Sequence, residues 1–144
     1  MAEIVRERYA YDRSKLKPRV LHIGFGAFSR AHTLRYLDDA LDTAGGDFGA
    51  VVARLNSGAD ELSELDAQGR EYLVIEADDT AMRARTIGCV VGTLNPQRDG
   101  VDAVPDLIAS AALCLVTLTI TEKGYCLRNG QLDRSNPAIS VDLE

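Results

Sequence analysis

Gly24 and Gly26, which are separated by one residue, stand where an apolar run at 19–25 gives way to a helix-like pattern. Strand, tight turn and helix in this order suit an anion, because glycine lets a ligand approach the backbone and a helix start presents free N–H groups. A dinucleotide pyrophosphate fits best. Ser29 occupies the third glycine position of G-x-G-x-x-G, so an S-adenosylmethionine site or a turn for helix packing stays open.

The end of the next apolar run, 48–55, is the usual place for a carboxylate that accepts hydrogen bonds from a cofactor ribose. This chain has Arg54-Leu55-Asn56-Ser57 there, without an acid. Asn56 can hydrogen-bond ribose hydroxyls, whereas Arg54 or Ser57 can accept a 2′-phosphate. The sequence therefore leaves both NAD and NADP open.

The histidines, the cysteines and the lack of a serine motif argue against a metal site, a disulfide framework and a hydrolase. The two histidines lack the acid spacing of metalloenzymes, so we expect no metal. His22, within an apolar strand, is expected to be a core residue, and Arg30 can bind either a phosphate or a carboxylate of a neighbouring segment. Three cysteines without C-x-x-C spacing favour neither a disulfide framework nor zinc. The nucleophile elbow G-x-S-x-G of hydrolases is missing.

Length and charge restrict the class of protein. A chain of 144 residues has the size of one domain. Its 16 basic and 22 acidic residues give a net charge of −6, which argues against a nucleic-acid partner. Apolar runs fall far short of the roughly 18 residues of a membrane span. Residues 1–19 are polar, unlike a signal peptide, so we expect a cytoplasmic protein without a membrane partner.

The elements that would position these residues alternate between strand and helix. Residues 1–18 form a basic arm, expected as a solvated charge run, and 19–144 form the dinucleotide-binding domain. The strands are expected at 19–25, 48–55 and 113–120, and the helices at 27–41, 59–67 and 102–110. Strand-like runs at 71–76 and 83–94 predict an antiparallel excursion, with bends at Gly88 and Gly92. The fold class is therefore α/β, a doubly wound, mostly parallel Rossmann-like sheet with an antiparallel edge extension.

From Cys126 onward the pattern weakens to loops and an interrupted helix start. The final Leu143-Glu144 is typical of a vector remnant. We therefore expect residues 1–144 to be a fragment of a longer protein.

Two segments resemble the mannitol dehydrogenase family of polyol-specific long-chain dehydrogenases. Gly24-Phe25-Gly26-Ala27-Phe28-Ser29-Arg30-Ala31-His32 is similar to its G-x-G-x-F-x-R-A-H turn, and Thr119-Ile120-Thr121-Glu122-Lys123-Gly124-Tyr125 to its T-x-T-E-x-G-Y strand end. Residues 68–74 resemble the segment that leads into the family's edge strands. The resemblance covers the chain from Arg19 to its end.

The resemblance implies the cofactor domain of an oxidoreductase that transfers hydride, without metal, between NAD, or alternatively NADP, and the secondary alcohol of a polyol or sugar acid. The substrate pairs would be of the mannitol/fructose or mannonate/fructuronate type. The family's catalytic lysine, with its Asn and His, lies in a second, mostly helical domain absent from these residues, so Lys123 is not that lysine. We expect this chain alone to be inactive, and an apolar face left by the missing domain to allow self-association. A non-catalytic regulatory module that binds a nucleotide is the alternative.

The resemblance also implies which residues bind the cofactor. Around the pyrophosphate and adjoining ribose it places Gly24, Phe25, Gly26, Ala27, Phe28 and Arg30. Asn56 would lie near the adenosine ribose. Thr119, Thr121 and Glu122 would face the crevice at the carboxyl end of a parallel strand. Alternatively, the two threonine hydroxyls bond local backbone, and Glu122 with Tyr125 orders the junction to the missing domain.

Overall fold

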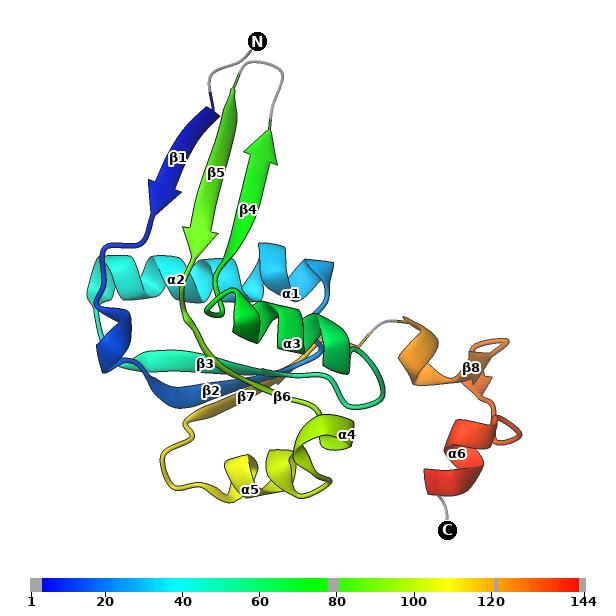
Figure 1. Ribbon diagram of the computed structural model, residues 1–144. Coiled ribbons are helices and arrows are strands. Elements are labelled where there is room, and N and C mark those ends of the chain that lie inside the picture. The colour runs from blue at the N-terminus through cyan, green and yellow to red at the C-terminus, as the bar shows by residue number, and fades with distance from the viewer. Residues whose placement is uncertain (1–3, 78–80, 121, 143–144) are drawn as a thin grey trace.

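A parallel sheet of four strands forms the centre of the domain. The computed structural model of the chain describes residues 4–77, 81–120 and 122–142 (Figure 1). The sheet has the order β6-β3-β2-β7, and all its pairings are parallel. Its strands are β2 (Lys17–Ile23), β3 (Phe48–Ala53), β6 (Val90–Leu94) and β7 (Leu115–Leu118). The first strand of this sheet, β2, lies between β3 and β7, and because all three are parallel their carboxyl ends meet at one edge.

Helices cover both faces of this sheet. On one face lie α1 (Ala27–Ala31), α2 (Thr33–Ala44) and α3 (Ala59–Ala67), and on the other α4 (Pro96–Asp99) and α5 (Ala103–Ala109) (Figure 1). The apolar side chains of β3 alternate accordingly: Ala50 and Val52 pack toward α2 and α3, whereas Val51 and Ala53 pack toward Val104 of α5. This arrangement confirms the predicted doubly wound α/β fold.

The first helix differs from its expected form. The sequence predicts one helix over 27–41, but α1 and α2 are separated at His32, whose φ of −122° and ψ of −75° leave the helical region. The ring of His32 lies between those of Phe28 and Tyr36, with centroid distances of 4.7 and 6.5 Å. The break therefore falls within the motif Phe28-Ser29-Arg30-Ala31-His32.

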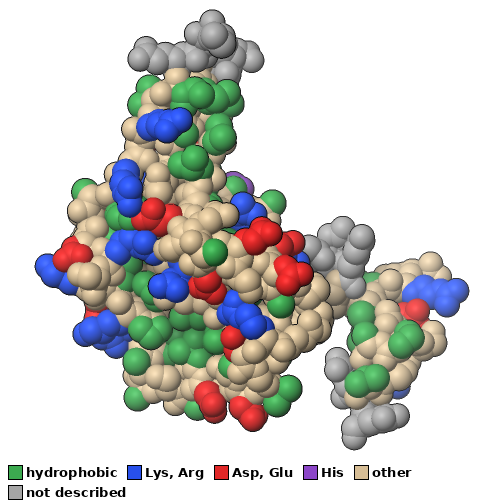
Figure 2. Space-filling model, viewed as in Figure 1, with side chains coloured by type: hydrophobic (Ala, Val, Ile, Leu, Met, Phe, Trp, Pro, Cys, Tyr) green, Lys and Arg blue, Asp and Glu red, His purple; other side chains and the backbone are tan. Residues whose placement is uncertain are grey.

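A second sheet projects from the body and contains β1 (Ile4–Arg8), β5 (Met82–Ile87) and β4 (Tyr72–Ala77) in that order. The β4–β5 pair is antiparallel, as expected of the edge extension, whereas β1 pairs with β5 in parallel. The predicted strand 83–94 is divided at Gly88: β5 belongs to this sheet and β6 to the central one. A Cβ at Gly88 would lie 2.1 Å from the Tyr9 ring, so the bend has no room for a side chain. Figure 2 shows apolar side chains exposed on this projection. Ile4, Leu73 and Ile75 of its strands are each about half exposed or more.

The basic N-terminal stretch is folded and does not form an arm, although most of its charged side chains are exposed to solvent as expected. Its first part is β1, and its second contains the short helix η1 (Arg13–Lys15). The guanidinium of Arg13 donates hydrogen bonds at 2.8 to 3.0 Å to the carbonyls of Gly69, Gly88 and Val90. These carbonyls lie near the point where the chain passes between the two sheets, so the positive charge there has a structural role.

Asp38 links the N-terminal stretch, α2 and β5. Its carboxylate is fully buried and accepts hydrogen bonds from the Tyr11 hydroxyl, the Gly88 N–H at 2.8 Å and the Arg85 guanidinium at 2.9 Å. Arg85 also contacts Asp42 at 2.6 Å. A buried charge needs such partners to compensate for lost hydration, so this cluster stabilises the junction between sheet and projection.

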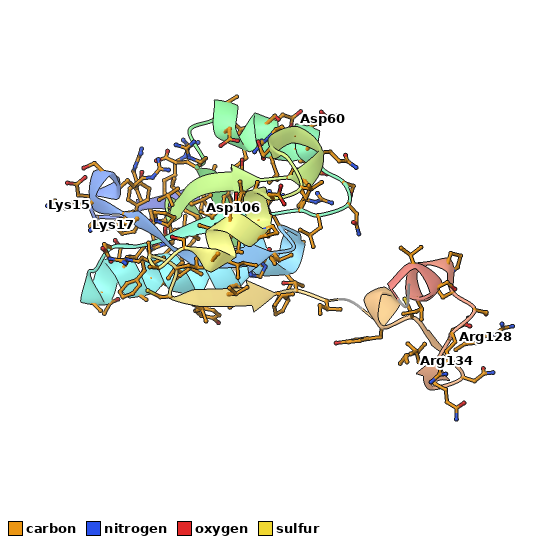
Figure 3. The ribbon with its side chains drawn as sticks, turned by 90° about the horizontal axis from the view of Figure 1, so that it is seen from below. Lys15, Lys17, Asp60, Asp106, Arg128 and Arg134 are labelled. Carbon is orange, nitrogen blue, oxygen red and sulfur yellow. The ribbon has the colours of Figure 1, made fainter. Side chains whose placement is uncertain are left out.

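The last described part of the chain lies apart from the body in two perpendicular views (Figures 1 and 3). It contains η2 (Glu122–Tyr125), β8 (Leu127–Arg128), β9 (Gln131–Leu132) and α6 (Pro137–Asp142). Strand β7, which precedes it, is shorter than the predicted 113–120 and leaves Leu115 and Leu118 more than half exposed. In the described parts of the chain, no helix is long and apolar enough to cross a membrane.

Replacing Asp38 tests the buried cluster. We expect Asp38→Ala to lower the free energy of unfolding by about 3 kcal/mol, because it leaves the buried Gly88 N–H without its acceptor and removes the fully buried one of the carboxylates that contact Arg85. In the neighbouring position, Asp39→Ala removes a carboxylate that is 39% exposed, and exposed pairs contribute less than about 1 kcal/mol. Urea unfolding measures both, and equal losses would contradict the role of Asp38.

Candidate cofactor site

A crevice of about 650 Å³ opens at the carboxyl ends of β2, β3 and β7. Three residues predicted to bind a cofactor, Gly24, Asn56 and Thr119, line it together. The other lining residues are Ile23, Arg54, Leu55, Ser57, Leu118, Ile120 and Gly124. In open parallel sheets ligands bind at this edge, where the strand order reverses.

The glycine turn forms the wall of the crevice at the end of β2. Gly24 has a φ of +107°, and its N–H donates to the Ala53 carbonyl at 2.8 Å. A Cβ at Gly24 would lie 3.1 Å from the Thr119 carbonyl oxygen, whereas a Cβ at Gly26 would meet no atom within 4 Å. The first glycine is therefore required by the protein's own packing, and the second leaves the backbone open to a ligand.

Ser29 fastens this turn, a role that sequence reasoning missed. The side chain is fully buried. Its hydroxyl lies 3.0 Å from the carbonyl oxygens of both Gly24 and Gly26 and accepts from the Gly26 N–H at 3.1 Å. With one proton to donate, the hydroxyl bonds one carbonyl at a time. The available signal was its position, where the dinucleotide fingerprint has its third glycine.

Asn95 fastens the loop that follows β3 and was also missed. Its fully buried amide nitrogen donates to the carbonyl of Arg54 at 2.8 Å and lies 3.4 Å from that of Ser57. Its carbonyl oxygen accepts from the Gln97 N–H at 2.9 Å, and the Gln97 side chain donates to the Asn56 carbonyl at 3.3 Å. Asn95 thus connects the ends of β6 and β3 and fixes the backbone around Asn56.

The cationic group of the crevice is Arg54, and it is paired. Its Nη1 donates to the Glu61 carboxylate in the first turn of α3. The Arg54 side chain passes next to Gly58, where an added Cβ would lie 2.5 Å from the arginine Nε. The φ of +83° at Gly58 likewise favours glycine. The pair brings a positive and a negative charge to the end of β3.

His22 lies beneath the crevice, buried as expected of a core histidine, with 1% of its surface exposed. Its Nδ1 is 2.8 Å from the Thr117 hydroxyl and its Nε2 is 3.1 Å from the Thr119 hydroxyl. Burial lowers the pKa of the imidazole below its ordinary value of 6.5, and a backbone hydrogen bond with Gly24 opposes the shift. The ring is therefore neutral at pH 7, and the Thr119 hydroxyl bonds a side chain in place of local backbone.

Gly26 and the other predicted residues are not among those that line this crevice. Phe25 is buried and meets the Tyr72 ring edge to face, with centroids 5.8 Å apart. The Arg30 guanidinium carbon lies 5.4 Å from the Phe25 ring centre and 5.5 Å from that of Tyr72. Ala27 lines another cavity, which it shares with Arg30, and Phe28 is 61% exposed.

Two predicted residues come from the strand end after β7. Glu122 begins η2, and Thr121 lies outside the described residues. Over the described ranges, no group of three or more His, Cys, Asp or Glu side chains could hold a metal ion. The crevice thus unites one member from each of three strand ends, Gly24, Asn56 and Thr119.

Comparison with known proteins gives a consistent result. A family model described as the mannitol dehydrogenase Rossmann domain matches residues 18–143. The chain is 36% identical to each of two relatives: D-mannonate oxidoreductase of Escherichia coli K12, over 141 residues, and mannitol 2-dehydrogenase of Cereibacter sphaeroides, over 138. These alignments cover 95% and 94% of this chain and 29% of each relative. An uncharacterized oxidoreductase of E. coli K12, YeiQ, is 40% identical over 93% of this chain and 28% of the relative.

A solved structure shows the same arrangement. The ternary complex of Pseudomonas fluorescens mannitol 2-dehydrogenase with NAD and D-mannitol superposes with a TM-score of 0.84 at 32% identity, covering 96% of this chain and 29% of that one. The chain therefore spans less than a third of the length of the relatives that it matches.

The pH dependence of stability tests the burial of His22. Its folded pKa lies below its unfolded value, so the unfolded chain binds the proton first as the pH falls. We expect this contribution to stability to be present above pH 6.5 and to be lost below it. The variant His22→Asn should show a weaker fall in the urea midpoint between pH 7 and 5, whereas His32→Asn, which changes the other, exposed histidine, should retain it. Identical profiles for wild type and His22→Asn would contradict the shifted pKa.

Proposed function

Because the chain belongs to the mannitol dehydrogenase family, whose Rossmann domain it contains, we propose that its crevice binds a nicotinamide dinucleotide, NAD first and NADP as the alternative. The observation that carries the proposal is the contrast between the two glycines. The position that a Cβ of Gly24 would take lies against Thr119, whereas the corresponding position at Gly26 has no protein atom within 4 Å. A pyrophosphate requires a tight turn after the strand and, next to it, a backbone that it can approach without meeting a Cβ.

The residues of the crevice suit the parts of such a cofactor. Asn56, Arg54 and Ser57, at the end of β3, would meet the adenosine ribose. Gly24 and Gly26 would meet the pyrophosphate, and Thr119 would lie on the side of β7. Phe25, Ala27, Phe28, Arg30, Thr121 and Glu122 stay proposed contacts that rest on family resemblance. A bound nicotinamide would supply hydride chemistry, while the chain's residues bind and orient it.

For the longer protein we propose an oxidoreductase that acts on the secondary alcohol of a polyol or sugar acid. Support comes from the relatives, which are named for mannitol and mannonate. The proton-accepting lysine and its partners would belong to a further domain, as the family resemblance implies. The three cysteines are free thiols, which suits the reducing cytoplasm that we propose as its location.

Calorimetric titration of the chain with NAD, NADP and S-adenosylmethionine tests the proposed ligand. We expect both dinucleotides to be bound weakly and the methyl donor not at all. The variant Gly26→Ala should weaken dinucleotide affinity by about tenfold or more, because a methyl group would enter the space left for the ligand. Its stability should change by less than about 0.5 kcal/mol, since that methyl meets no protein atom.

Gly92→Ala is the matched control, because its added Cβ would make an ordinary contact of 3.4 Å with Val51 inside the sheet. It should leave affinity unchanged. Binding of S-adenosylmethionine alone, or equal effects of the two alanine variants, would contradict a dinucleotide at Gly26.

Turnover assays test the division of labour between domains. With either dinucleotide, residues 1–144 should convert none of mannitol, fructose, mannonate or fructuronate, because the family resemblance places the group that takes the hydroxyl proton in a further domain. Measured turnover would show that the chain contains its own catalytic base. A regulatory module would likewise bind without turnover, so the same assay on a longer polypeptide distinguishes the two functions.

A further inference from the structure

Arg54 is the positive group at the place where a dinucleotide ribose lies in doubly wound sheets. It follows β3 directly and lines the crevice with Asn56 and Ser57. An arginine at this position accommodates a 2′-phosphate, whereas NAD-specific sites have an acid there. By residue type alone, Arg54 would favour NADP.

The structure shows that this arginine already has an anionic partner. Its Nη1 bonds the Glu61 carboxylate, and its side chain is 28% exposed. Gly58 provides the path, because any Cβ there would collide with the arginine side chain. The Arg54 side chain therefore occupies the space beside Gly58 and extends toward Glu61 of α3.

A 2′-phosphate at this end of β3 would meet two obstacles. It would have to share or displace the Glu61 carboxylate to reach Arg54, and it would bring further negative charge next to that carboxylate. A 2′-hydroxyl carries no charge and meets neither obstacle. Glu61 is 64% exposed, so solvent weakens the repulsion, and the discrimination should be moderate.

We infer that Glu61 is a specificity-determining residue, which holds Arg54 and so makes the crevice select a dinucleotide without a 2′-phosphate. This inference rests on the proposed function, since it concerns which cofactor the same crevice takes. Among the acids of α3, Glu61 and Glu64 both line a second cavity with Arg30. Asp66 pairs with Arg70 and Arg98, and Asp60 lies at the outer surface (Figure 3). Glu61 is the acid of this helix that contacts Arg54.

Calorimetric titration of the chain with NAD and NADP, and with 5′-AMP and 2′,5′-ADP as probes of the 2′-phosphate, tests the inference. Wild type should bind NAD more tightly than NADP. In Glu61→Gln, affinity for NADP and 2′,5′-ADP should rise about five- to tenfold, with NAD and 5′-AMP within about twofold of wild type. The change should shrink at high salt, because the pair is exposed.

Two further variants separate the pair from the general charge of the helix. Glu64→Gln removes the same charge three residues later and should leave the ratio of NAD to NADP affinity unchanged. Arg54→Gln, added to Glu61→Gln, should abolish the gain for NADP. Circular dichroism checks that each variant is folded.

Each alternative result has a definite meaning. If wild type prefers NADP, or if Glu61→Gln and Glu64→Gln change the ratio alike, the inference is overturned while the dinucleotide site stands. If neither dinucleotide binds, the inference and the proposed function both fail.

Discussion

The close approach of Gly24 to Thr119 is the constraint on which the crevice depends. The ends of β2, β3 and β7 come together there, because the Gly24 N–H bonds the Ala53 carbonyl while its Cα faces the Thr119 backbone. A side chain at this point would be strained by the φ of +107° and would press against the Thr119 carbonyl of the strand end after β7. The turn can therefore hold its shape before any ligand arrives, which reduces the ordering that binding would have to offset.

Neutral groups fix the crevice, and charged groups stabilise its surroundings. Ser29, Asn95 and His22 are buried and bond backbone carbonyls or hydroxyls close to the lining. Arg54, which lines the crevice, is held by Glu61, and the other charged clusters lie farther out, as at Asp38 with Arg85. Burying a charge beside a ligand site is costly unless an opposite charge is buried with it. Hydrogen bonds between uncharged groups therefore give a rigid lining without requiring a particular charge on the ligand.

Local sequence patterns predicted much of the fold. Apolar runs and turn residues indicated three of the central strands, β2, β3 and β7, and the helices α2, α3 and α5, because these signals lie within a few residues of each other. Strand β6 was predicted as part of the antiparallel excursion and belongs to the central parallel sheet instead. The role of β1 could not be seen, since Ile4 pairs with Met82 and a strand of alternating charges looks like a solvated arm. For the site, Gly24, Asn56 and Thr119 were predicted together. Ser29 and Asn95 were missed because their bonds to backbone carbonyls depend on the folded path of other segments.

The position of His22 gives the crevice an internal spectroscopic probe. Its two ring nitrogens lie between hydroxyls of Thr117 and Thr119, and the latter residue lines the crevice. The chain has two histidines, so the imidazole region of its proton NMR spectrum is simple enough to assign by one substitution. A rearrangement at Thr119 would alter the His22 resonances directly. Ligand binding in the crevice can thus be followed by the chemical shifts of the buried His22 ring, without a label at the binding site.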